Sequence, residues 1–242
     1  MSTRNLSSTG RRKIQRNISN RRAIYIAIIS AYITNLGKYN EGELVGKWHD
    51  FPTTPEEIAE TFREIRIDGA RYEEFFISDY DVEVHGLIDH LGAYTGLDEI
   101  NYLASLLDEM EEHDLATYEA IAGTGEYCYS LRDLINLTGN TDCFDYLQGV
   151  NDDYDLGYYW VEESGCYDTE SMGALARYID YERFGRDISL DEDGTFASGG
   201  YVLKRDSLDE FYDGMDMPEE YRVFPAMDMY TGPAMAMGVA PC

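Results

Sequence analysis

Apolar and polar positions in the first part of the chain follow the periods of short strands and one helix. An apolar run at residues 23–34 leads into a turn at Gly37 and predicts a buried strand, and a second strand is expected at 43–48. Thr54, followed by a proline and by a glutamate three residues later, is typical of a capped helix start. Alternation at residues 72–84 predicts a third strand.

The middle of the chain is predicted to be mainly helical. Thr95 supplies a second capping signal, and apolar residues then recur at helical spacing while acidic residues occupy the opposite face. A further short helix is expected to begin at Ser130 and to end near Gly139. The apolar stripe of the first helix consists of Leu97, Ile100, Leu103, Leu107 and Met110.

Helices and strands are both expected after Gly139. The sequence predicts a short helix at 144–147, a strand at 156–162 and a helix at 171–184 that Gly185 ends. A following Asp193-Gly194 turn predicts a β-hairpin. The two strands of this hairpin are either 188–190 and Phe196, or Phe196 and 201–203.

This order of elements predicts an α+β fold divided into three small units. We expect an α+β N-terminal domain at 23–95, a helical middle domain at 96–138 and an α+β C-terminal domain at 139–203. Residues 1–22 form a basic leader that is expected to be flexible. Residues 204–242 hold six of the nine Met and four of the six Pro, which predicts a poorly ordered tail with at most a short docking helix.

The charge of the chain indicates an unusual surface. The sequence has 47 Asp and Glu against 19 Lys and Arg, a formal net charge of −28. Seven of the basic residues lie within the first 24 positions, and between Tyr72 and Ala176 the 25 acidic residues face a single basic one, Arg132. Repulsion therefore excludes nucleic acid and anionic membranes as partners and predicts a basic partner.

The cysteines and histidines show no metal-binding or disulfide pattern. Cys128, Cys143, Cys166 and Cys242 form no CxxC pair, and the four histidines form no HExxH motif. We therefore expect no metal and no disulfides, which favours a cytoplasmic location. The apolar run at 23–33 is too short to span a bilayer, and the leader before it is interpreted as a flexible extension rather than a signal or transit peptide.

Catalytic chemistry has little specific support in this sequence. Asn151, Asp153, Asp155 and Glu162 occupy positions 1, 3, 5 and 12 of a calcium-binding loop, but Leu156 stands where the sharp turn requires glycine. Carboxylate pairs are so numerous that they indicate no particular active site, and no nucleophile elbow or phosphate-binding loop is present. The sequence favours a protein that is not an enzyme and has no cofactor, with a carboxylate- or calcium-dependent hydrolase as the alternative.

The dense acidic positions are the strongest functional signal. Double-stranded DNA carries one negative charge per ~1.7 Å of its axis, so rows of carboxylates can imitate phosphates and occupy a DNA-binding groove. An acidic chaperone of basic DNA-binding proteins and a solvated acidic surface without a specific role are the competing interpretations. The acids expected to face the partner are Glu73, Glu74, Asp79, Asp81, Glu83, Asp98, Glu99, Asp108, Glu109, Glu111, Glu112, Asp114, Asp152, Asp153, Asp155, Glu162 and Glu163.

Two segments of the chain resemble a known protein family. Residues 35–48, with the sequence NLGKYNEGELVGKW, and residues 178–187, with the sequence YIDYERFGRD, look like segments of the ArdA-type antirestriction proteins of mobile genetic elements. They occur in the same order as in that family. The resemblance covers about residues 31–203, so the leader and the tail fall outside it.

The resemblance implies an elongated homodimer whose carboxylates imitate the bent DNA bound by type I restriction-modification enzymes. The partner would be the DNA channel formed by the specificity and methyltransferase subunits of such an enzyme. The resemblance also favours a dimer interface around residues 171–187, although the apolar residues there can instead pack inside the C-terminal unit. The residues expected at the interface are Leu175, Tyr178, Ile179 and Arg183.

Overall fold

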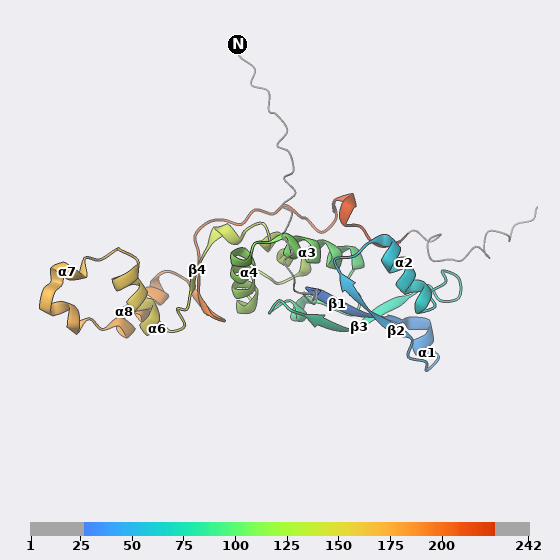
Figure 1. Ribbon diagram of the computed structural model, residues 1–242, viewed down its shortest axis with the longest axis horizontal. Helices are drawn as coiled ribbons and strands as arrows, with labels where there is room; N and C mark the ends of the chain where they lie inside the picture. The colour runs from blue at the N-terminus through green and yellow to red at the C-terminus, as the bar shows by residue number, and fades with distance from the viewer. Residues whose placement is uncertain (1–26, 226–242) are drawn as a thin grey trace, which may run out of the picture.

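The computed structural model describes residues 27–225 of the chain. The expected leader at 1–22 and the last part of the expected tail, 226–242, lie outside the described residues. Along the long axis of Figure 1 the elements follow one another from α1 and α2 at one end to α7 at the other, and the chain then returns over the helices. Helices and small antiparallel sheets are mixed throughout, which confirms the predicted α+β class.

The N-terminal part is built on a three-stranded antiparallel sheet in the order β2-β1-β3. The three predicted strands are present. The first begins at Ile29, and residues 23–26 of its predicted range lie outside the described residues, while the second lies three residues later than expected. Residues 41–45 instead close the turn after the first strand, where the Lys38 ammonium binds the carboxylates of Glu41 and Glu43. The elements of this part are β1 (Ile29–Asn35), α1 (Leu36–Asn40), β2 (Gly46–Phe51), β3 (Phe75–Val82) and the 3-10 helix η1 (Ile88–His90).

Helix α2 (Pro55–Glu64) begins where the capping signal predicts. The Thr54 hydroxyl accepts a hydrogen bond from the Glu57 N–H, and the Glu57 carboxylate accepts one from the Thr54 N–H. Both backbone N–H groups thereby gain a hydrogen-bond acceptor, which donors at the start of a helix otherwise lack. Ile58 and Phe62 then project into the core.

Three helices form the middle part: α3 (Leu97–Glu109), α4 (Glu112–Thr124) and α5 (Leu131–Leu137). The predicted cap at Thr95 is wrong, because the Thr95 hydroxyl accepts a hydrogen bond from the Gly92 N–H, and Gly96 precedes the helix without a side-chain cap. The predicted start of α5 is confirmed, since the Ser130 hydroxyl accepts a hydrogen bond from the Asp133 N–H.

Helix α4 was not predicted from the sequence. Its buried face includes Thr117 and the small residues Ala120 and Ala122, beside the larger Tyr118 and Ile121. Small and polar residues on the inner face weaken the contrast between apolar and polar positions on which such a prediction depends.

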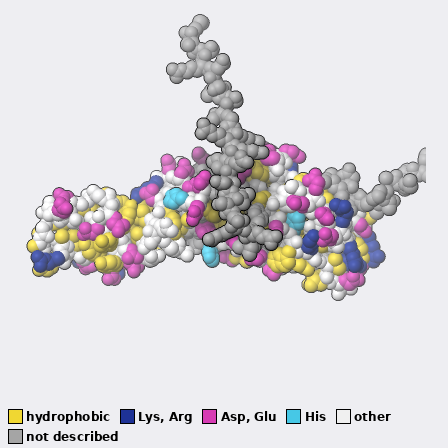
Figure 2. All heavy atoms as spheres, in the orientation of Figure 1, with side chains coloured by type: hydrophobic (Ala, Val, Ile, Leu, Met, Phe, Trp, Pro, Cys, Tyr) yellow, Lys and Arg dark blue, Asp and Glu magenta, His cyan; other side chains and the backbone are white. Residues whose placement is uncertain are grey.

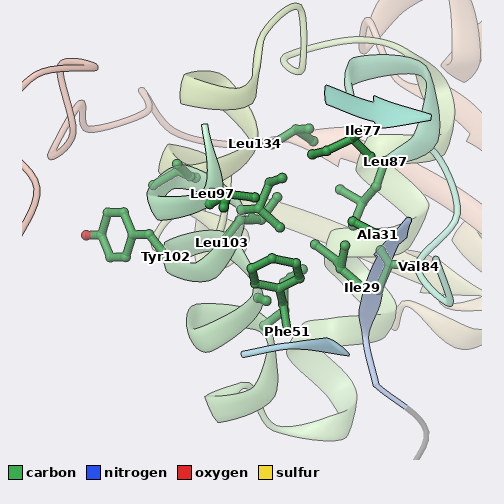
Figure 3. Close-up of a cluster of buried hydrophobic side chains, with 14 of the residues drawn as sticks. Ile29, Ala31, Phe51, Ile77, Val84, Leu87, Leu97, Tyr102, Leu103 and Leu134 are labelled. Carbon is green, nitrogen blue, oxygen red and sulfur yellow. The ribbon is translucent and has the colours of Figure 1, made fainter. Parts of the chain in front are cut away.

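One hydrophobic core joins the sheet to the middle helices. Figure 3 shows Ile29 and Ala31 of β1 gathered with Leu97 and Leu103 of α3, and Phe51 of β2 lies beside them. Each of these side chains is at most 2% exposed. Burial of one such aliphatic or aromatic side chain stabilises a fold by ~1.5–3 kcal/mol. The expected N-terminal and middle units therefore share one apolar interior.

The remainder of the chain up to Lys204 contains a second three-stranded sheet, in the order β4-β6-β5, and several short helices. The predicted hairpin is found in its second form, and the first form is wrong because residues 188–190 belong to a helix. The elements are η2 (Thr141–Cys143), β4 (Phe144–Gln148), α6 (Asp153–Tyr158), the π-helical turn η3 (Tyr159–Glu163), α7 (Thr169–Met172), η4 (Gly173–Tyr178), α8 (Tyr181–Asp191), β5 (Thr195–Ala197) and β6 (Gly200–Lys204). We name residues 151–191 the end region.

Three sequence predictions fail here. The expected helix at 144–147 is strand β4, which pairs along its whole length with β6. The expected strand at 156–162 is helical, because the Asp152 side chain caps α6 and the helix continues into η3. The expected helix at 171–184 is interrupted, because the Asp180 side chain caps a new helix, α8, in which Gly185 is an internal residue.

Helices α6 and α8 approach each other closely through two glycines. A Cβ atom at Gly185 would overlap the carbonyl oxygen of Asp153, and one at Gly157 would overlap the carbonyl oxygen of Tyr181. Only glycine therefore allows this approach of the two backbones. A small second cluster of buried apolar residues lies next to this pair and consists of Val150, Leu156, Tyr201 and Leu203.

Residues 205–225, which we name the strap, return from β6 across the middle helices toward α2 (Figure 1). The expectation of poor order is wrong for these residues, because Tyr212 is 2% and Val223 is 1% exposed. The strap contains a short 3-10 helix, η5 (Glu219–Tyr221), that contacts α3, in agreement with the predicted docking helix.

Candidate partner-binding surface

Strand β3 and its flanks carry the first acidic group, which comprises Glu73, Glu74, Asp79, Asp81 and Glu83. All five side chains are exposed, whereas Ile77 of the same strand is buried. The Asp79 carboxylate accepts a hydrogen bond from the adjacent Tyr80 N–H. Within residues 27–225 the other four side chains have no hydrogen-bonding or ion-pair partner.

The junction between α3 and α4 carries the second acidic group, which comprises Asp108, Glu109, Glu111, Glu112 and Asp114. Helix α3 ends at Glu109 without a basic residue in its last turn. Negative charge at a helix C-terminus is unfavourable by ~0.3–1 kcal/mol per residue, so helix stability does not account for Asp108 and Glu109. Asp114 is half-buried and the other four are exposed, and none has a side-chain partner in the part of the chain that the structure describes.

The end region carries the third acidic group, which comprises Asp152, Asp153, Asp155, Glu162 and Glu163. Most of these carboxylates hold local structure. Asp152 caps α6, and Asp153 binds the Arg186 guanidinium at 3.1 Å. The Glu162 carboxylate accepts the Tyr181 hydroxyl at 2.6 Å, which raises the pKa of Tyr181 to about 12. The third group is therefore less free to bind a partner than the first two.

Two further predicted acids, Asp98 and Glu99, bind the strap. The Asp98 carboxylate accepts the N–H groups of Val223 and Phe224, each at 2.7 Å. The Glu99 carboxylate accepts the Tyr212 hydroxyl at 3.0 Å. Burial and this hydrogen bond raise the pKa of Tyr212 above its ordinary value. Both acids are half-buried, and no local sequence signal distinguishes them from the exposed acids.

Lys and Arg side chains gather over the end that carries α1 and α2, as Figure 2 shows. There the Glu41 carboxylate binds Lys38 at 2.9 Å and Arg71 at 2.8 Å. Hydrogen bonds from Lys38 and Tyr72 lower the pKa of Glu41 to about 2. Glu64 similarly binds Lys47 at 2.6 Å. Glu41, Glu43 and Glu64 are thus paired with neighbouring basic side chains, in contrast to the acids of the first and second acidic groups.

Residues 151–162, which match four positions of a calcium-binding loop in sequence, adopt a different structure. Asp155 accepts the Asn151 N–H, and Glu162 lies in the π-helical turn that follows α6. No group of three or more His, Cys, Asp or Glu side chains within residues 27–225 is arranged to hold a metal ion. In the same part of the chain, no helix has both the length and the apolar character needed to cross a membrane.

The residues predicted at a dimer interface lie near α7 and η4, at one end of the long axis in Figure 1. Leu175 is 71% and Tyr178 is 77% exposed, whereas Ile179 is half-buried. Arg183 is exposed. Leu175 and Tyr178 belong to η4, which ends at Tyr178, whereas Arg183 belongs to α8, which begins after Asp180.

A known protein family matches most of this chain. The chain matches the family model of the antirestriction protein ArdA over residues 31–203. A search of curated proteins found no match. The matched residues run from β1 into β6, include all three acidic groups and stop just before the strap. Since the match covers well over half of the sequence, the chain belongs to the ArdA family of antirestriction proteins.

Proposed function

We propose that this protein inhibits type I restriction-modification enzymes by occupying their DNA-binding channel with its carboxylates. The family match carries this proposal, and the exposure of the first and second acidic groups supports it. Such carboxylates can bind the Lys and Arg groups that normally hold DNA phosphates, and release of counterions favours the complex at low salt. No covalent bond changes in this process, so the protein acts as an inhibitor and not as an enzyme.

We further propose that the inhibitor is an elongated homodimer that joins through the end region. Leu175 and Tyr178 are large side chains that one protomer leaves 71% and 77% exposed. The Arg177 guanidinium lies 5.9 Å from the centre of the Tyr178 ring, which adds a cation–π contact to this apolar patch. Twofold symmetry would double the acidic array and suit an enzyme whose DNA target has two half-sites.

The proposed target is the channel formed by the specificity and methyltransferase subunits. Binding there competes directly with DNA, and the inhibitor acts in the cytoplasm, where restriction of incoming DNA takes place. Because many exposed ion pairs share the binding energy, neutralising one acid such as Glu109 is expected to cost less than ~1 kcal/mol.

The decisive experiment measures displacement of DNA from a purified type I enzyme at several salt concentrations. The wild-type protein is expected to displace DNA and to block ATP-dependent cleavage, with an affinity that falls steeply as salt increases. Unchanged DNA binding and cleavage at low salt and molar excess of the inhibitor would contradict the proposal.

A matched pair of variants tests whether the position of the charges matters. The first variant neutralises four acids of the second acidic group, and the control neutralises four exposed acids near α2, where Lys and Arg gather. The first is expected to lose at least about tenfold in inhibition and the control much less. The substitutions of the first are Asp108→Asn, Glu109→Gln, Glu111→Gln and Glu112→Gln; those of the control are Glu43→Gln, Glu56→Gln, Glu60→Gln and Glu64→Gln.

The same assay separates the proposal from its alternatives. A hydrolase would lose its activity completely when one particular carboxylate is replaced, whereas a DNA mimic loses inhibition gradually. An acidic chaperone would bind histone-like basic proteins as tightly as it binds the restriction enzyme. Equal loss of inhibition in the two quadruple variants would favour binding by net charge alone.

A further inference from the structure

We propose that the strap is a fixed brace that sets the distance between the first and second acidic groups. Asp98 and Glu99 are then positioning residues that hold the strap, and they are not contacts for the restriction enzyme. The role of the brace in inhibition rests on the function proposed above, whereas its attachment does not. The strap lies outside the family match, which ends at residue 203, so this brace is a feature of this chain beyond the matched region.

Two asparagines of the middle part bind the strap through its backbone. The Asn140 side-chain oxygen accepts the Asp209 N–H at 2.7 Å, and its amide nitrogen donates to the Asp209 carbonyl at 2.9 Å. This is the pattern of contacts that a neighbouring strand would make. The Asn136 oxygen accepts the N–H groups of Phe211 and Tyr212, both at 2.9 Å. Asn140 is 2% exposed, so its hydrogen bonds to the strap are shielded from water.

A third asparagine connects the strap to the N-terminal sheet. The Asn101 amide nitrogen donates to the Tyr221 carbonyl at 3.0 Å, and its oxygen accepts the Thr53 N–H at 2.7 Å. Thr53 lies between β2 and α2. One buried side chain of α3 thus binds both the strap and the connection that leads into α2.

The far end of the strap reaches the beginning of β3. The Phe224 ring stacks on Phe75 with 6.2 Å between ring centres and contacts Phe62 of α2 at 6.0 Å. Phe75 directly follows Glu73 and Glu74 of the first acidic group. The second acidic group lies beyond the opposite end of α3, the helix that Asp98 and Asn101 belong to. The strap therefore binds both elements whose relative position determines the spacing of the two groups.

Hydrogen exchange of the strap amides in the isolated full-length protein tests the attachment. The amides of residues 209–224 are expected to exchange slowly in the wild type and at least about tenfold faster in Asp98→Ala and Asn136→Ala. Asp108→Ala is the matched control, because it removes an exposed carboxylate from the same helix that forms no hydrogen bond or ion pair with the strap. Equal exchange in Asp98→Ala and Asp108→Ala, or unprotected strap amides in the wild type, would overturn the proposed attachment.

Inhibition by an uncharged variant tests the brace itself. Asn136→Ala leaves the net charge unchanged, so a strap without a role in inhibition would leave DNA displacement unchanged. We expect inhibition about tenfold weaker and a shallower salt dependence, because the two acidic groups no longer bind in one arrangement. Tyr212→Phe keeps the ring and removes only the hydroxyl that Glu99 accepts, so it provides a milder variant if Asn136→Ala fails to fold. A released strap with unchanged inhibition would overturn the brace. A wild type that never inhibits would contradict the proposed function and the role of the brace in it, but not the attachment of the strap.

Discussion

Side chains are packed differently around the first sheet and in the end region. In the first, Phe62, Leu103 and Tyr118 are at most 1% exposed and belong to one large core. In the second, Tyr154 is 51% and Leu190 is 77% exposed, and the main contact is the close approach of α6 and α8. The comparison teaches that this chain concentrates its buried apolar contacts around the first sheet, whereas the end region depends mainly on one closely packed pair of helices.

The largest expected effect is the loss of a core side chain. Leu103→Ala removes a fully buried side chain from the shared core and is expected to lower the free energy of unfolding by ~2–5 kcal/mol. Leu44→Ala is the control, because Leu44 is 71% exposed and its truncation should change stability by less than ~0.5 kcal/mol. Urea denaturation followed by circular dichroism measures both values. Similar losses in the two variants would mean that stability does not reside in this core.

A smaller effect is expected at the glycine contact of the end region. Gly185→Ala places a methyl group against the Asp153 carbonyl and is expected to cost ~1–3 kcal/mol, because α6 and α8 must separate. Gly123→Ala in α4 meets no atom within 4 Å, so it should be neutral or stabilise the helix by up to ~1 kcal/mol. Thermal unfolding compares the variants. A neutral Gly185→Ala would show that the two helices have room to move apart.

The core half is also expected to be sensitive to mild acid through His49. Its ring nitrogens lie 2.8 Å from the hydroxyls of Thr61 and Thr53, and burial lowers the pKa of His49 below 6.5 while Glu57 opposes this shift. Between the lowered pKa and 6.5 the unfolded chain binds more protons than the folded one. The free energy of unfolding therefore falls as the pH decreases from 7 through 6.5 toward 5.5.

Two histidine variants check this expectation. His49→Gln should remove the fall in stability between pH 7 and 5.5, whereas His85→Gln, at an exposed position, should retain it. Chemical denaturation at several pH values measures the difference. A wild type whose stability is constant over this range would show that His49 is protonated equally well in the folded and unfolded states.

The smallest effect on stability is expected at the exposed apolar patch of the end region. Leu175→Ser together with Tyr178→Ser should change the free energy of unfolding of one protomer by less than ~0.5 kcal/mol, since both side chains are largely solvated. The proposed dimer should nevertheless dissociate, which sedimentation at micromolar concentration measures. A monomeric wild type would contradict the dimer, and an intact double variant would place its interface elsewhere.

The sequence predicts correctly those helix starts whose capping residue and partner lie close together in the chain. The capping box of Thr54 and Glu57 and the cap at Ser130 were found because their partners lie three residues away. The stretch from Leu156 to Glu162 contains the aromatic and β-branched residues typical of a strand, but it is helical and packs on α8 through a glycine contact. That contact is invisible in the local pattern.

The candidate surface shows the same division between local and distant information. The exposed acids of β3 could be identified from alternation and composition alone. The binding of Asp98 and Glu99 to the strap could not, because Val223, Phe224 and Tyr212 lie more than a hundred positions later in the chain. The asparagines that hold the strap gave no signal either, since a lone amide does not indicate its distant partner.

The attachment of the strap has a consequence for protein synthesis. The hydrogen bonds of Asp98 to the strap close loops of 125 and 126 residues, so Asp98 leaves the ribosome long before its partners. Contacts of this sequence separation are slow to form, because the entropy of loop closure is lost before the contact stabilises the chain. The nascent chain thus folds its sheet and helices before the strap has been synthesised. A product of translation interrupted before residue 205 would lack the strap, expose the Tyr102 ring that Tyr212 and Tyr221 contact, and become a preferred substrate for cellular proteases.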